Sequence, residues 1–95
     1  GLTETLKIAH MAQAANLPIA PHIHGSAVAV AAAVHLLGAV RNGSMAETVY
    51  PAHALMNELV KEPLLVDKNG DITLSERPGL GIDLDPKTVK MYLVQ

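Results

Sequence analysis

Residues Ala27 to Val40 form an almost uninterrupted run of alanine, valine and leucine, and this run constrains the fold more than any other segment. Small aliphatic residues on every side of one helix predict that other elements bury the helix all round. The run contains His35 and Gly38 and is shorter than the roughly 20 apolar residues of a membrane span. We therefore expect a buried helix, with Ser26 as its N-cap.

The segments around this helix alternate between helical and extended patterns. A helix is expected from a cap at Thr3 to about Ala15, because polar residues recur on one side and apolar residues cover the rest. Leu17–Pro21 is typical of a short extended segment, since its prolines exclude a helix. After a turn at 41–44, Met45–Tyr50 predicts a second short strand. This alternation predicts an α/β fold with a parallel sheet or barrel.

The length of the chain limits how much of such a fold it can build. With 95 residues it forms at most one small domain, although 49% of the residues are hydrophobic. A core of small aliphatic side chains suits helices packed closely on a sheet, which needs more elements than this length supplies. We therefore expect a piece of a larger protein.

The pattern changes after Pro51. A short helix is expected at 54–60, followed by a hairpin of 64–67 and 71–74 around Asn69-Gly70, which is a strong hairpin signal. A turn at 77–81 precedes a brief strand at 82–84. Asp85 and Pro86 are suited to cap and begin a final helix that ends near Leu93.

Charge and composition exclude several classes of protein. The net charge is −2 and the seven basic residues are scattered, so the basic patch of a nucleic-acid-binding protein is missing. The chain has no cysteine, which excludes a disulfide framework and a thiolate zinc site. The first residues do not resemble a signal peptide. We expect a cytoplasmic protein that binds neither nucleic acid nor a membrane.

The candidate catalytic residues are His22 and Glu47, each at or near the end of an expected strand. If the two strands are neighbours in a parallel barrel, both side chains face one cavity at its carboxyl edge, which suits an acid–base pair. The alternative interpretation is an ordinary surface pair of a histidine and a carboxylate.

The other histidines allow a second interpretation. His22 and His24 form a His-x-His pair, and a zinc site is conceivable there, although no third ligand lies at a diagnostic spacing. His35 is expected to be a hydrogen-bonded packing residue, whereas His10 and His53 look like surface positions. Residues 79–81 predict a turn, because no helix begins there to bind a phosphate.

An ordered series of segments carries a resemblance to a known family. The segments are Gly1-Leu2-Thr3-Glu4, Ile19-Ala20-Pro21-His22, Val34-His35-Leu36, Glu47, Asn69-Gly70 and Arg77-Pro78-Gly79-Leu80-Gly81-Ile82. Together they resemble the carboxyl-terminal end of the mandelate racemase and muconate lactonizing enzyme family of the enolase superfamily. The resemblance implies that residues 1–52 are strands seven and eight of a modified TIM barrel with their helices. Residues 53–95 would be a tail that packs on an α+β capping domain.

The family resemblance also implies a reaction. Its members abstract the proton α to a carboxylate, and Mg²⁺ stabilises the resulting enediolate. His22 matches the seventh-strand histidine, which is the general base or, in sugar-acid dehydratases, the acid that helps the hydroxyl group leave. Glu47 matches the eighth-strand glutamate, which binds the substrate carboxylate and the enediolate. The polar loop with His24 and Ser26 favours a polyhydroxylated substrate, and hence a sugar-acid dehydratase over a racemase.

The same resemblance implies what this chain lacks. The three carboxylate ligands of Mg²⁺ are expected upstream, so no metal ligand is assigned here, and the chain alone is expected to be inactive. Its expected partners are the rest of the barrel, the capping domain, a small sugar acid and further copies of the same protein. The alternatives are an inactive fragment and a non-catalytic α/β interaction module that uses Ala27–Val40 as its contact.

Overall fold

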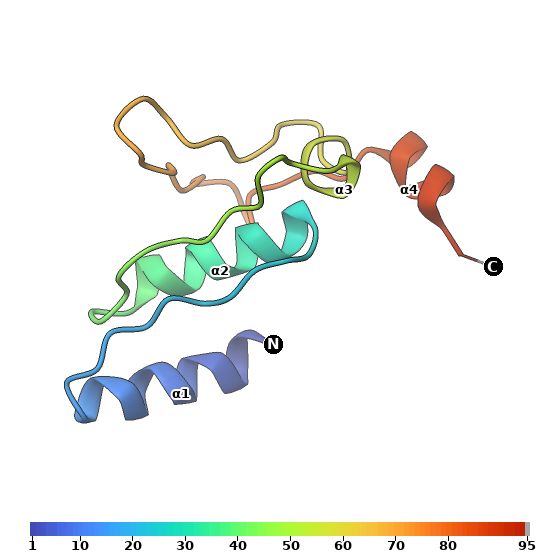
Figure 1. Cartoon of the computed structure of the whole chain (residues 1–95). Helices are drawn as coiled ribbons and strands as arrows, with labels where there is room; N and C mark the ends of the chain where they lie inside the picture. The colour runs from blue at the N-terminus through green and yellow to red at the C-terminus, as the bar shows by residue number, and fades with distance from the viewer. Residues whose placement is uncertain (95) are drawn as a thin grey trace.

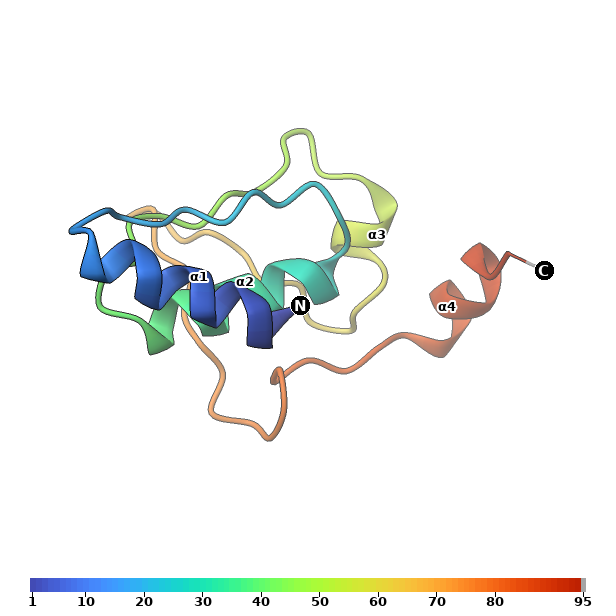
Figure 2. The same cartoon turned by 90° about the horizontal axis from the view of Figure 1, so that it is seen from below.

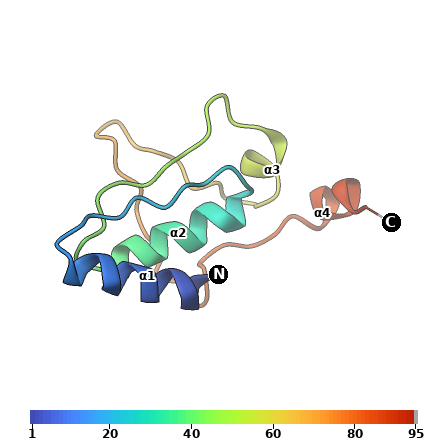
Figure 3. The same cartoon turned by 60° about the horizontal axis from the view of Figure 1, so that its bottom comes forward.

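The computed structural model describes residues 1–94, and Gln95 lies outside the described residues. The helices are α1 (Leu2–Ala14), α2 (Ala27–Ala39), α3 (Ala54–Asn57) and α4 (Pro86–Tyr92). Helices α1 and α2 lie side by side and run in the same direction, on one side of two extended segments (Figures 1, 2 and 3). This arrangement has the helix and strand order expected of neighbouring units in a parallel barrel.

Helix α1 confirms the expected helix but begins earlier than its expected cap. Gly1 is the N-cap and Thr3 lies within the first turn, so the expectation of a Thr3 cap is wrong. The Thr5 hydroxyl donates instead to the Gly1 carbonyl at 2.9 Å. Asn16 follows the helix with φ 55°, a left-handed conformation that asparagine tolerates better than most residues. The chain can therefore reverse into the first extended segment.

Helix α2 is buried on most sides, as its composition predicts. Val30, Ala33 and Val34 form the core with Ile23 from the preceding loop and Met56 from α3. Ser26 occupies the expected N-cap position, and its carbonyl accepts from the Val30 N–H at 3.1 Å. Its side chain makes no capping hydrogen bond, so that part of the expectation is wrong.

The two extended segments touch through one parallel bridge, between Ile19 and Gly43. The Ile19 N–H donates to the Asn42 carbonyl at 2.8 Å, and the Ser44 N–H donates to the Ile19 carbonyl at 2.9 Å. The next donor along the first segment would be Pro21, which has no N–H. For this reason the expected strand at 45–50 is wrong, although the segment remains extended beside its neighbour.

The expected hairpin forms its turn but not its strands. Gly70 has φ 88°, and the Asp67 N–H donates to the Asp71 carbonyl at 2.9 Å. Beyond this pair the two arms form no ladder within the described residues, and Leu64 and Ile72 pack instead against the core. The local chemistry of the turn was readable from the sequence, whereas pairing of the arms was not.

The remaining tail elements are shorter than expected. Helix α3 has 4 residues, so the expected helix at 54–60 is too long. The expected strand at 82–84 is reduced to one antiparallel bridge between Val60 and Leu84. The final helix is confirmed, since the Asp85 carboxylate accepts from the Lys87 N–H at 2.8 Å and Pro86 begins α4. Helix α4 lies apart from α1 and α2 in all three views (Figures 1, 2 and 3).

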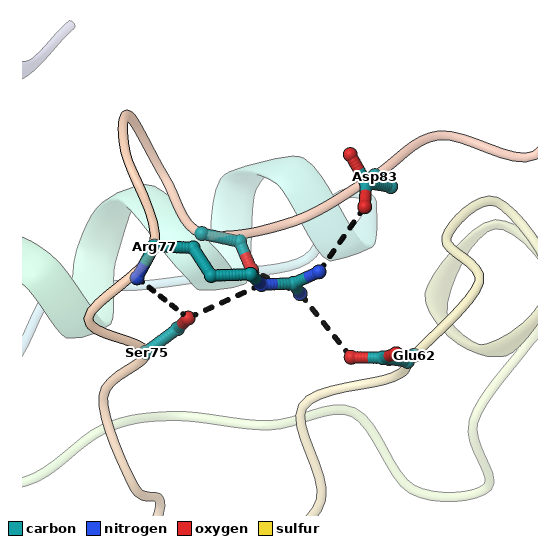
Figure 4. A network of polar contacts seen from close by, with 5 residues as sticks. Glu62, Ser75, Arg77 and Asp83 are labelled. Atoms are coloured by element: carbon teal, nitrogen blue, oxygen red, sulfur yellow. Dashed lines mark hydrogen bonds and ion pairs between the residues drawn. The ribbon is translucent and has the colours of Figure 1, made fainter.

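Arg77 joins three parts of this tail (Figure 4). Its guanidinium contacts Asp83 at 3.1 Å and Glu62 at 3.3 Å, and it donates to the Gly81 carbonyl. The Ser75 hydroxyl also accepts from the Arg77 N–H at 3.1 Å. Several donors on one planar group can hold segments that are themselves irregular.

Candidate functional site

His22 and Glu47 meet where the two extended segments leave their bridge. The His22 Nδ1 lies 3.0 Å from one oxygen of the Glu47 carboxylate and 3.1 Å from the other. The two side chains are 79% and 41% exposed, so the pair is open to solvent. The structure thus brings together the two residues that the sequence singled out, although they lie 25 positions apart.

Alternation along the loop directs the side chains of this site. Ile23 is only 4% exposed and packs in the core, while His22 and His24 on either side are exposed. Alternate residues of an extended segment point to opposite faces, which places the two imidazoles on one face. Their ring centroids are 6.4 Å apart and the ring planes differ by 17°.

The two histidines line a cavity of about 600 Å³. Its other walls are the first turn of α1, near Leu2 and Thr5, and one face of α2, near Ala29. Ser26 does not line this cavity; it is half-buried at the start of α2. The structure therefore groups His24 with His22 at this cavity, whereas neither Glu47 nor Ser26 lines it; the expectation that the side chains of His22 and Glu47 face one cavity is wrong for this cavity.

The contact between His22 and Glu47 determines what the imidazole can do. A carboxylate beside Nδ1 favours the tautomer with its proton on Nδ1, so Nε2 is left as the hydrogen-bond acceptor. When Nε2 takes a second proton, the carboxylate remains the hydrogen-bond acceptor of Nδ1. The arrangement can accept and release a proton at Nε2, which is the chemistry of a general acid or base.

The described residues do not make up a metal centre. Within residues 1–94, no three His, Cys, Asp or Glu side chains lie together in a group that could hold an ion. The residues present therefore do not fit a Mg²⁺ site, and they give the zinc interpretation no ligand set. His35 is a packing residue as expected, since its Nδ1 lies 2.9 Å from the Ala31 carbonyl within α2.

Asn42 is a positioning residue that the sequence did not single out. Its Nδ2 donates to the carbonyls of Ala9 and Leu17, both at 3.0 Å. These bonds attach α1 and the first extended segment to the turn from which Glu47 follows. The sequence offered only a turn signal, Asn42-Gly43, which does not reveal a partner that lies 33 positions away.

None of the helices formed by residues 1–94 has the length and apolar character required to cross a bilayer.

Comparison with known proteins gives the family of the chain. Residues 1–88 match the family described as enolase C-terminal domain-like. The D-xylonate dehydratase of Haloferax volcanii is 33% identical over 97 residues, an alignment that covers 100% of this chain and 23% of the dehydratase. The chain spans about a quarter of the length of the curated relatives that it matches.

Solved structures agree with this match. An enolase of the mandelate racemase subgroup from Agrobacterium tumefaciens superposes with a TM-score of 0.81 and 38% identity, covering 96% of this chain and 25% of that one. The 3,6-anhydro-D-galactonate cycloisomerase of Zobellia galactanivorans superposes with a TM-score of 0.85 and 35% identity, covering 100% and 26%. The resemblance to the mandelate racemase and muconate lactonizing enzymes is confirmed, and the chain belongs to the enolase C-terminal domain-like family.

Proposed function

We propose that this chain is the carboxyl-terminal part of an enzyme that dehydrates a sugar acid. The observation that carries the proposal is the 3.0 Å contact between the His22 imidazole and the Glu47 carboxylate. The similarity to a D-xylonate dehydratase supports the choice of dehydration among the reactions of this superfamily. Residues 1–52, as strands seven and eight of a barrel with their helices, would dock on the rest of the barrel, and the tail at 53–95 would dock on a capping domain.

The proposed reaction removes water from neighbouring carbons. The proton leaves the carbon α to the substrate carboxylate, and the bond to the β-hydroxyl breaks with its electron pair on oxygen. The His22 imidazolium then donates its Nε2 proton to that oxygen and so completes the water molecule, while Glu47 contacts Nδ1 and would bind the substrate carboxylate and the enediolate. The base that takes the α proton would come from outside residues 1–94.

Substrate binding and charge stabilisation complete the proposal. His24 lines the same cavity as His22 and would contact substrate hydroxyl groups. Ser26 is the N-cap of α2 outside that cavity, so it would contact only a substrate that extends beyond the cavity. Mg²⁺, held by carboxylates outside this chain, would stabilise the negative charge of the enediolate when bound. We also propose that the whole protein is an oligomer of identical subunits.

The proposal is tested on the protein expressed from its complete reading frame. D-xylonate, arabinonate and D-galactonate are incubated with Mg²⁺, and formation of the 2-keto-3-deoxy acid is measured. We expect at least one to be dehydrated, with kcat about 10²- to 10⁴-fold lower for His22→Asn, since a positioned proton donor contributes about that much. His10→Asn, which changes an exposed histidine of α1, is the matched control and should leave kcat unchanged.

Two results would contradict the proposal. One is that the unmodified protein converts none of a broad panel of sugar acids, which would favour the non-catalytic interaction module. The other is that His22→Asn retains the activity of the unmodified protein.

A further inference from the structure

The imidazole of His22 is held at one atom but exposed elsewhere. Glu47 contacts Nδ1, whereas 79% of the side chain is open to solvent. A ring fixed only at one corner can tilt about that contact, and tilting moves Nε2, the atom that would carry the proton. Proton transfer requires heavy atoms within about 2.6–3.2 Å, so a small tilt lowers the rate.

The His24 ring lies where it limits this tilt. Its centroid is 6.4 Å from that of His22 and the planes differ by 17°, so the rings are stacked with an offset. Aromatic rings at centroid separations of about 4.5–7 Å attract one another in this geometry. The stacked ring therefore opposes motion of His22 out of its plane, a direction that the carboxylate at Nδ1 does not control.

The residue between the two histidines fixes the position of this stack through core packing. Ile23 is 4% exposed and lies in the core with Val30, Val34 and Met56. Because Ile23 fixes the backbone, the Cα positions of both histidines are set by core packing. At the following Gly25 a larger residue would crowd α2, because an added Cβ would lie 3.3 Å from the Ala29 Cβ.

We propose that His24 is a positioning residue for His22. In addition to any contact with substrate, it keeps the imidazole in the plane that aims Nε2 at the leaving hydroxyl. This inference rests on the proposed function, because it takes the reaction from there, whereas the stacking geometry of the two rings does not depend on it. It predicts that the flat ring at position 24 determines kcat, whereas its nitrogen atoms affect only KM.

The test compares His24→Ala with His24→Phe in the protein from the complete reading frame, using the sugar acid that it converts. Phenylalanine keeps a flat ring for stacking, whereas alanine removes it. We expect kcat to be about 3- to 10-fold lower in His24→Ala than in His24→Phe, because only phenylalanine keeps the stacked ring. Both variants lose the imidazole nitrogens and are expected to raise KM, so a higher kcat in His24→Phe than in His24→Ala is the decisive result.

Crystal structures of the two variants supply a readout independent of activity. We expect His22 to keep its contact with Glu47 and a single ring orientation in His24→Phe, and to adopt more than one orientation in His24→Ala. Equal kcat in the two variants, or an unchanged single orientation of His22 in His24→Ala, would overturn the inference. If no sugar acid is converted, the proposed function fails, and the crystal structures still decide whether His24 orients His22.

Discussion

Truncation of Ile23 should loosen the core directly beneath the two histidines. Ile23→Ala removes three carbons from a side chain that is 4% exposed. At about 0.8 kcal/mol for each buried methylene the transfer loss is about 2.4 kcal/mol, and incomplete collapse of the cavity adds to it. We therefore expect the local free energy of unfolding to fall by about 3 kcal/mol, and by about 1 kcal/mol for Ile23→Val, which removes a single carbon.

Hydrogen exchange of the α2 amides measures this loss locally, whatever the size of the intact protein. A loss of about 3 kcal/mol should accelerate exchange of the Val30 and Val34 amides roughly 100-fold, and a loss of about 1 kcal/mol roughly fivefold. The valine variant is the internal control, because it keeps a branched side chain at the same position. If exchange of α2 is unchanged by Ile23→Ala, or if both substitutions cost the same, Ile23 does not anchor the loop to the core.

Three further predictions concern the tail. In thermal melts, Gly81→Ala should lower the free energy of unfolding by roughly 2 kcal/mol or more, because φ is 66° and an added Cβ would lie 2.5 Å from the Ser75 side chain. The control is Gly79→Ala, where φ is 70° but the space around an added Cβ is open, and this change should cost only about 1 kcal/mol. Hydrogen bonds from backbone N–H groups, chiefly that of Asp71, lower the pKa of the Asp67 carboxyl below its ordinary 3.8. The ionised Asp67 carboxylate should therefore stabilise the turn above pH 3.8, and this stabilisation should be lost as the pH falls through the lower pKa of the folded state. The NMR shifts of the turn residues should change over that pH range, and Asp67→Asn should abolish the change. Arg77→Ala should lower the free energy of unfolding by about 2 kcal/mol in urea titrations. In 1 M NaCl only part of this difference should disappear, because salt screens the ion pairs with Glu62 and Asp83 more than the hydrogen bond to the Gly81 carbonyl. Complete loss of the difference in salt would assign it to the ion pairs alone.

The helices were predictable from the sequence because their signals are local. The Ala27–Val40 run, the Asp85-Pro86 start and the polar spacing after Thr3 each involve residues within a few turns of one another. The strands were not predictable in the same way, since a strand exists only when a partner offers free hydrogen-bonding groups. Here Pro21 interrupts the ladder after one bridge, and the apolar pattern of 45–50 could not reveal this.

The candidate site was likewise predictable only where its signals are local. Strand-end positions and residue types were enough to choose His22 and Glu47, because parallel neighbours bring their ends to one edge. The polar character of the loop also indicated Ser26 as a substrate contact, yet Ser26 is the N-cap of α2 and does not line the cavity. Asn42 was missed because its two acceptors, Ala9 and Leu17, belong to α1 and to the first extended segment, and no local pattern encodes such distant partners.

The single bridge between Ile19 and Gly43 has a consequence for changes in chain length. The bridge fixes which side of the extended segment each later side chain faces. Inserting or deleting one residue between Gly43 and Glu47 would therefore turn the Glu47 carboxylate to the opposite side of the segment. The Glu47 carboxylate would then face away from the imidazole of His22. Substitutions between the two positions should be tolerated when they preserve the extended backbone, but the spacing itself should admit no indel in any member that uses this pair.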